Sequence, residues 1–88
     1  MPWRLRFDKR AVRELKKLSH DNRRRVAAFI DERLLAAENP RTFGKALTGS
    51  YSGLWRYRVG DVRIVARIVD EELIILVLSI GHRREVYR

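Results

Sequence analysis

The end of the chain carries side chains that could act together on a phosphodiester. His82, Arg83, Arg84 and Tyr87 fall within six residues. A tyrosine or histidine can take the proton of a 2′-hydroxyl, and a guanidinium can stabilise a phosphorane, although its pKa above about 12 makes it a poor proton carrier. These residue types fit cleavage of RNA without a metal. Their spacing alone slightly favours a basic chain end whose Tyr87 only covers the core.

A second group of cations is expected on a β-hairpin over residues 54–65. Two runs rich in β-branched and aromatic residues flank Gly60-Asp61, and a glycine at the first turn position suits a type II′ loop. A two-residue loop fixes the register. The expected pairs are Val59 with Val62, Tyr57 with Ile64, Trp55 with Ala66, Arg58 with Arg63 and Arg56 with Val65.

Alternation along the two strands separates an apolar face from an arginine face. The predicted arginine face carries Arg56, Arg58, Arg63 and Arg67. Like charges opposite each other destabilise a sheet by about 0.2–1 kcal/mol, whereas guanidinium groups match the geometry of phosphate. We therefore expect this face to bind a polyanion, extended by Lys45 in the preceding loop. From the hairpin alone, a merely solvated basic face fits as well.

Composition places the positive charge in the folded body of one small domain. The 88 residues include 20 Lys and Arg against 11 Asp and Glu, a net charge of +9, and both halves of the chain are basic. Such a balance is expected for a nucleic-acid binder or the partner of an acidic protein. The absence of cysteine excludes disulfides and thiolate metal sites, and two histidines disfavour zinc. No leader-like or membrane-length apolar run occurs, which predicts a cytoplasmic protein without membrane contact.

The periodicity predicts an α+β fold. The expected elements are a strand over 3–7, a helix over 9–18 capped by Asp8, a helix from about 23 to 38 ended by Asn39-Pro40, a loop over 41–53, the hairpin extended to Val69, and a strand over 73–80. The two helices form an antiparallel hairpin on one face of a mostly antiparallel sheet. The run over 73–80 is apolar on both faces, as in an interior strand, and the first strand joins the edge next to it. The arginine face is expected to stay open.

The whole chain resembles the RelE/ParE superfamily of toxins from toxin–antitoxin pairs. The segments that carry the resemblance are Phe7–Val12 with Leu15–Leu18, Lys45–Gly49, Trp55–Gly60, Val62–Val65 and Gly81–Tyr87. No segment is specific alone, but their order and spacing together are. The resemblance implies a RelE-like microbial ribonuclease architecture over residues 1–88.

The resemblance also implies an activity, because the branches of this superfamily differ. RelE-like members are messenger-RNA endoribonucleases that cut in the ribosomal A site, whereas ParE-like members poison DNA gyrase. This chain keeps the RelE-type positions: Tyr87 would activate the 2′-hydroxyl, Arg83 would serve the leaving group, and Arg63 would hold the phosphate. The expected products are a 2′,3′-cyclic phosphate and a 5′-hydroxyl. A gyrase-directed toxin and a plain nucleic-acid-binding module are the alternatives.

One departure concerns the general base. Some relatives carry lysines where this chain has Arg56 and Arg58, and arginine does not lose its proton. The base would then be Tyr87 or His82, with Arg56, Arg58, Lys45 and Arg84 as contacts to the RNA phosphates. Surrounding guanidinium groups favour a phenolate, so the hypothesis is that they lower the pKa of Tyr87 from its usual value near 10. Replacing Arg58 and Arg63 should then raise that pKa in a spectroscopic titration.

The partners implied by the resemblance are a cognate acidic RelB-like antitoxin, messenger RNA and the 70S ribosome. The antitoxin is expected to lay an amphipathic helix over an apolar groove, with the surface near the two helices as a candidate. Operator DNA is expected to be bound only through the antitoxin complex, and no cofactor or metal is implied. The candidate ribosome contacts on the helices are Arg13, Lys16, Lys17, Arg23, Arg24 and Arg25.

Overall fold

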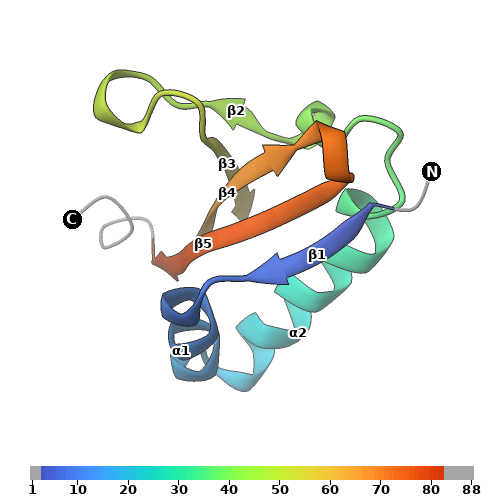
Figure 1. The fold of residues 1–88 in the computed structure, drawn as a ribbon. Coiled ribbons are helices and arrows are strands. Elements are labelled where there is room, and N and C mark those ends of the chain that lie inside the picture. Colours follow the sequence, from blue (N-terminus) through green and yellow to red (C-terminus); the bar gives the residue numbers. More distant parts are fainter. Residues whose placement is uncertain (1–2, 83–88) are drawn as a thin grey trace.

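A five-stranded sheet with two helices on one face forms the body of the computed structural model, which describes residues 3–82 (Figure 1). The strands are β1 (Arg4–Phe7), β2 (Lys45–Ala46), β3 (Trp55–Val59), β4 (Val62–Val69) and β5 (Ile74–His82). The helices are α1 (Lys9–Lys17) and α2 (His20–Phe29), the latter continued by a π-helical turn over Ile30–Leu34. The predicted α+β class with both helices on one face is confirmed.

β5 is an interior strand of the sheet, as its apolar sequence predicts. The strand order is β1-β5-β4-β3-β2, and only β1 is parallel to its neighbour, with Phe7 opposite Val77. Ile75 and Val77 of β5 are fully buried, and they pack in one core with Val26 and Leu34 of the second helical segment. The first strand therefore joins the sheet beside β5, as expected.

The hairpin between β3 and β4 has the predicted register at all five pairs, from Trp55 with Ala66 to Val59 with Val62. Gly60 has a φ of +60° and Asp61 a negative φ, as a type II′ turn requires. The turn residues thus decide which side chains of the two strands share a face.

The second helix differs from its predicted range at both ends. It begins at His20, three residues early, because the Ser19 side chain accepts a hydrogen bond from the backbone N–H of Asn22. Regular helix ends at Phe29, and the π-helical turn closes when the Leu35 N–H bonds to the Ile30 carbonyl. Asn39, predicted to stop this helix, instead caps a 3₁₀ turn over Pro40–Phe43.

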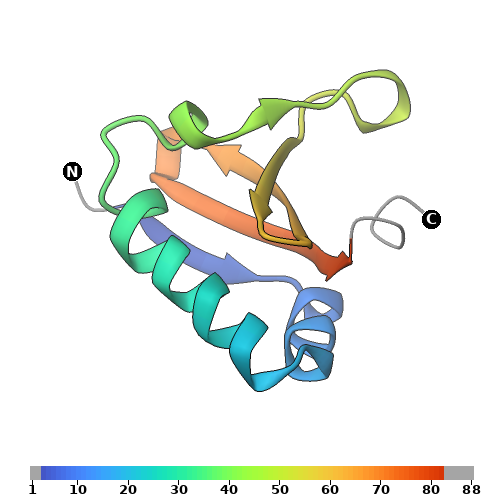
Figure 2. The same ribbon diagram turned by 180° about the vertical axis from the view of Figure 1, so that it is seen from behind.

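The segment 41–53 is not only a loop, because it contains β2. Lys45 lies opposite Arg56 and Ala46 opposite Trp55, so a fifth strand covers the outer edge of β3. Two residues are too few to show a period, which is why the sequence did not reveal this strand. The chain from Leu47 to Leu54 then projects from the sheet on the side away from α1 and α2 (Figures 1 and 2).

Candidate functional site

The hairpin and β2 bring four of the predicted cationic residues onto one face of the sheet. Arg58 lies directly opposite Arg63. Lys45 lies opposite Arg56, which is two residues from Arg58 and therefore on the same face. We call Lys45, Arg56, Arg58 and Arg63 the cationic face. Its members come from three adjacent strands, so the sheet fixes their spacing.

Arg63 differs from the other members of the cationic face in its burial. Its exposed fraction is 7%, whereas Arg58 and Lys45 are exposed and Arg56 is half-buried. The expectation of a fully open arginine face is therefore wrong at Arg63. Within the described residues, β2 pairs only with Trp55 and Arg56 and leaves the outer side of Arg58 without a strand, whereas Arg63 has a strand on each side, with Arg58 of β3 and Gly81 of β5 as its partners. A guanidinium in such a place is less screened by water and attracts an anion more strongly.

Arg63 also adjoins the end of β5, the strand that leads into the predicted catalytic tail. It lies opposite Gly81 in the β4–β5 pairing. Arg58, Arg63 and Gly81 therefore form one row across three strands. Arg83, Arg84 and Tyr87 follow in the sequence and lie outside the described residues, so their roles stay predictions.

His82 does not share the row of Arg58 and Arg63. It is exposed and lies opposite Val62, whose side chain is buried on the helix side of the sheet. A cavity of about 170 Å³ beside His82 is lined by Glu14, Lys17, Leu18, Ile80 and Gly81. The structure thus places His82 next to α1, on the opposite side of the sheet from the cationic face.

Tyr57 supports the cationic face from the other side of β3. It is fully buried, as its place on the apolar face predicts, and its hydroxyl donates a 2.8 Å hydrogen bond to the carbonyl of Pro40. Burial raises the pKa of Tyr57 to about 12, and the nearby Arg41 partly opposes this rise. Because Pro40 leads through Gly44 into β2, this bond helps to place Lys45. No local sequence pattern predicts this hydrogen bond.

A bidentate ion pair fixes the same segment at a second point. Arg41 donates to both carboxylate oxygens of Asp70, at 3.0 and 2.6 Å, and its guanidinium lies 5.7 Å from the ring centre of Trp55. The hydrogen bonds from Arg41 hold the pKa of Asp70 below its usual value. The pair joins the chain before β2 to the turn between β4 and β5. No local pattern predicts a contact across 29 residues.

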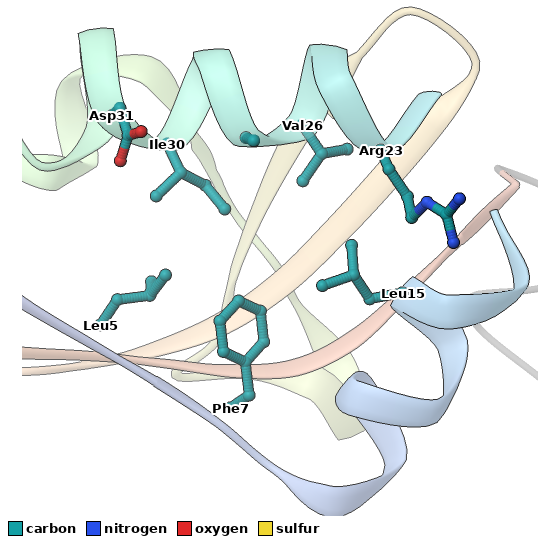
Figure 3. Close-up of a pocket in the computed structure, with 8 residues that line it drawn as sticks. Leu5, Phe7, Leu15, Arg23, Val26, Ile30 and Asp31 are labelled. Carbon is teal, nitrogen blue, oxygen red and sulfur yellow. The ribbon is translucent and has the colours of Figure 1, made fainter. Parts of the chain in front are cut away.

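An apolar groove lies on the helix side of the sheet, between β1, α1 and α2 (Figure 3). It encloses about 320 Å³, and Arg23 and Asp31 flank its two ends. Its apolar lining consists of Leu5, Phe7, Leu15, Val26, Ala27 and Ile30. The groove lies near the two helices, the candidate surface for a partner helix, and its occupant stays a prediction.

Two absences hold within residues 3–82. That range contains no group of three or more His, Asp and Glu side chains placed to hold a metal ion. None of the helices in the same range is long and apolar enough to cross a bilayer.

Comparison with known proteins places the chain in a family. Residues 5–87 match the model of the ParE toxin of type II toxin–antitoxin systems. The chain is 33% identical to Toxin RelG of Mycobacterium tuberculosis, covering 100% of this chain and 99% of that protein. It is 32% identical to the mRNA interferase toxin RelE of Escherichia coli, covering 99% and 92%.

Solved structures agree with this placement. The toxin–antitoxin complex RelBE2 of Mycobacterium tuberculosis contains a chain that superposes with a TM-score of 0.85 at 30% identity, covering 97% of this chain and 95% of that one. The intact RelBE toxin–antitoxin complex of Escherichia coli gives a TM-score of 0.73 at 26% identity, with coverages of 91% and 95%. The protein therefore belongs to the RelE/ParE family of toxins of type II toxin–antitoxin systems.

Proposed function

We propose that the protein is a ribosome-dependent endoribonuclease that cleaves messenger RNA and so inhibits translation in the cytoplasm. The observation that carries the proposal is the row of Arg58, Arg63 and Gly81, which joins a pair of arginines suited to a phosphate to the end of β5. The likeness to a curated mRNA interferase supports the same activity. This likeness favours a nuclease over a toxin directed at gyrase.

In the proposed reaction, Tyr87 takes the proton of a 2′-hydroxyl, and the 2′-oxygen attacks the adjacent phosphorus. Arg63 holds the phosphate and balances the charge of the phosphorane. The bond from phosphorus to the 5′-oxygen then breaks. Arg83 stabilises the charge on the leaving oxygen, which takes its proton from water because a guanidinium keeps its own. The products are a 2′,3′-cyclic phosphate and a 5′-hydroxyl. The step uses no metal ion.

The remaining cations hold the RNA on either side of the reacting phosphate. Lys45, Arg56 and Arg58 project from neighbouring strands and suit successive phosphates, with Arg84 in the same role. His82 is the alternative base. Its place beside α1, away from the cationic face, favours Tyr87. The proposed contacts to ribosomal RNA in the A site are six exposed cations of α1 and α2: Arg13, Lys16, Lys17, Arg23, Arg24 and Arg25.

The proposed regulator is a cognate acidic antitoxin that places an amphipathic helix in the groove between β1, α1 and α2. The groove is apolar along its floor and carries one charge of each sign at its ends, which suits an amphipathic helix. Both structural neighbours named above are complexes with an antitoxin. Operator DNA is proposed to be bound through that complex and not by the toxin alone.

Induced expression followed by primer extension on a reporter messenger RNA tests the nuclease proposal. The wild type should arrest growth and create new 5′ ends, and Tyr87→Phe, Arg83→Ala and Arg63→Ala should abolish both effects. Arg6→Ala, on the exposed side of the distant edge strand β1, is the matched control and should act as the wild type. Growth arrest without new RNA ends would overturn the proposal, and a gyrase supercoiling assay would follow.

A further inference from the structure

Glu14 of α1 binds the end of β5 directly. Its Oε1 accepts a 2.9 Å hydrogen bond from the backbone N–H of Ile80 and a 3.1 Å hydrogen bond from the Ser79 hydroxyl. Its Oε2 accepts from Nε of Arg10 at 3.2 Å. One carboxylate thus joins two elements that are 66 residues apart.

The Glu14 carboxylate accepts a backbone hydrogen bond from β5 at a point where β1 no longer runs beside that strand. β1 runs beside β5 only as far as Phe7, opposite Val77, and the last backbone bond on that side runs from the Asp8 N–H to the Val77 carbonyl. Ile80 lies three residues further on and is 1% exposed, so water cannot easily reach its N–H group. A buried N–H without an acceptor is costly, and the Glu14 carboxylate supplies that acceptor.

The hydrogen bond from Ile80 to Glu14 lies one residue before Gly81, where the predicted site begins. Gly81 follows Ile80 and lies opposite Arg63, and the next residues are His82 and Arg83. The helix that carries Glu14 is itself fixed, because Ala11 is fully buried, Leu18 nearly so, and the Asp8 side chain caps its first turn. Glu14 therefore transmits the fixed position of α1 to the strand end that leads into the tail.

The ion pair with Arg10 contributes less to the role of Glu14 than the hydrogen bond from the Ile80 N–H does. Both side chains are partly in solvent, with exposed fractions of 25% for Glu14 and 48% for Arg10. Exposed pairs at this helical spacing contribute little to stability. A hydrogen bond from a backbone N–H to a carboxylate is shorter and stronger, and it serves a strand that would otherwise lack an acceptor.

We propose that Glu14 is a positioning residue of the nuclease site: its carboxylate holds Ile80 and thereby Gly81, opposite Arg63, in the geometry that cleavage requires. This inference rests on the proposed function. Glu14 touches no substrate and moves no proton. It acts on the rate through the placement of Gly81 beside Arg63, whereas RNA binding on β2 and β3 does not depend on it.

Three variants separate this role from general stability. Glu14→Ala should lower kcat for cleavage of ribosome-bound messenger RNA about tenfold to a hundredfold, since small misplacements of reacting groups cost this much. Its KM should stay within about twofold of the wild-type value, because the cationic face is intact. Glu14→Gln keeps an oxygen acceptor for Ile80 and should restore most of kcat. Arg10→Ala removes the other partner of the same carboxylate and should leave both constants unchanged.

Amide hydrogen exchange supplies a readout that needs no activity. The Ile80 amide should be protected in the wild type, in Glu14→Gln and in Arg10→Ala, and should lose protection in Glu14→Ala while Ile75 stays protected. An unchanged Ile80 amide in Glu14→Ala overturns the inference, and so does a Glu14→Gln variant as slow as Glu14→Ala. If the wild type cuts no RNA, the nuclease proposal fails, and the exchange of Ile80 alone still decides whether Glu14 holds the strand.

Discussion

At the scale of single residues, the buried hydroxyl of Tyr57 helps to position the cationic face although it is not part of that face. Its ring packs beneath the cationic face, 5.9 Å from the ring centre of Phe29, and its hydroxyl satisfies the Pro40 carbonyl. Because burial raises its pKa to about 12, Tyr57 stays protonated and donates this bond at all ordinary pH values. A tyrosine in a toxin of this family therefore need not be catalytic.

Tyr57→Phe should destabilise the protein by about 1–3 kcal/mol at pH 7, because the Pro40 carbonyl loses its donor. The effect should depend on pH. The pKa of Tyr57 is higher in the folded state than the ordinary value of 10.0, so its contribution is fully present below pH 10 and is lost as the pH rises through about 12. Urea denaturation at pH 7 and pH 11.5 checks this. A gap between wild type and variant that stays constant with pH would contradict it.

At the scale of elements, Gly44 decides where β2 can lie. Its backbone is extended, with φ of −119°, so any residue could adopt the conformation. A Cβ atom there would lie 2.9 Å from Cε1 of Tyr57, closer than Cβ atoms approach in real structures, and 3.1 Å from the Arg56 carbonyl oxygen, tighter than most Cβ contacts. Gly49 is the opposite case, since its φ is +64° and its surroundings are open. Gly44 is required because a side chain would not fit, and Gly49 is required because its φ is positive.

Gly44→Ala should therefore cost about 1–3 kcal/mol through overpacking and should shift Lys45 away from Arg56. Gly49→Asn is the matched control, because asparagine accepts a positive φ and nothing there would clash. Thermal unfolding measures the cost, and RNA binding by the two variants measures the shift. Equal losses of RNA affinity in both would show that β2 does not help to bind RNA.

Local sequence pattern predicted the elements whose own residues show a turn dipeptide or a regular pattern of apolar residues. The β3–β4 register followed from Gly60-Asp61, and the interior position of β5 followed from its apolar faces. Contacts between distant residues left no trace in the sequence. The Arg41–Asp70 pair and the bond from Ile80 to Glu14 join residues 29 and 66 positions apart, and the register that places His82 beside α1 depends on the assembled sheet.

At the scale of the whole molecule, two surfaces lie on different sides of one sheet. The cationic face occupies the side away from the helices, and the apolar groove lies between the helices and β1 (Figure 3). A partner in the groove would leave the cationic face uncovered unless it extends around the sheet edge. We therefore expect changes in the groove to affect neutralisation without affecting cleavage.

Ala27→Arg should weaken antitoxin binding at least about tenfold, because a long charged side chain would occupy the apolar groove. Ala27 is exposed, so the fold should tolerate the change. Ala28→Arg, one residue along the same helix and outside the groove lining, should bind as the wild type. Titration calorimetry with the cognate antitoxin measures the affinities, and messenger-RNA cleavage should be equal in both. Unaltered affinity of Ala27→Arg would exclude the groove.

The pairing of β1 with β5 also governs when a newly made chain can fold. These strands come from opposite ends of the sequence, yet they are neighbours, and β5 joins β1 to the rest of the sheet. A nascent chain that has not been synthesised as far as Ile74 lacks β5. Its β1 then has no strand to pair with, and Glu14 has no Ile80 N–H to accept from. Sheets built from such distant segments fold late and slowly. The complete sheet, with Arg63 enclosed between β3 and β5, therefore forms only after β5 has been synthesised.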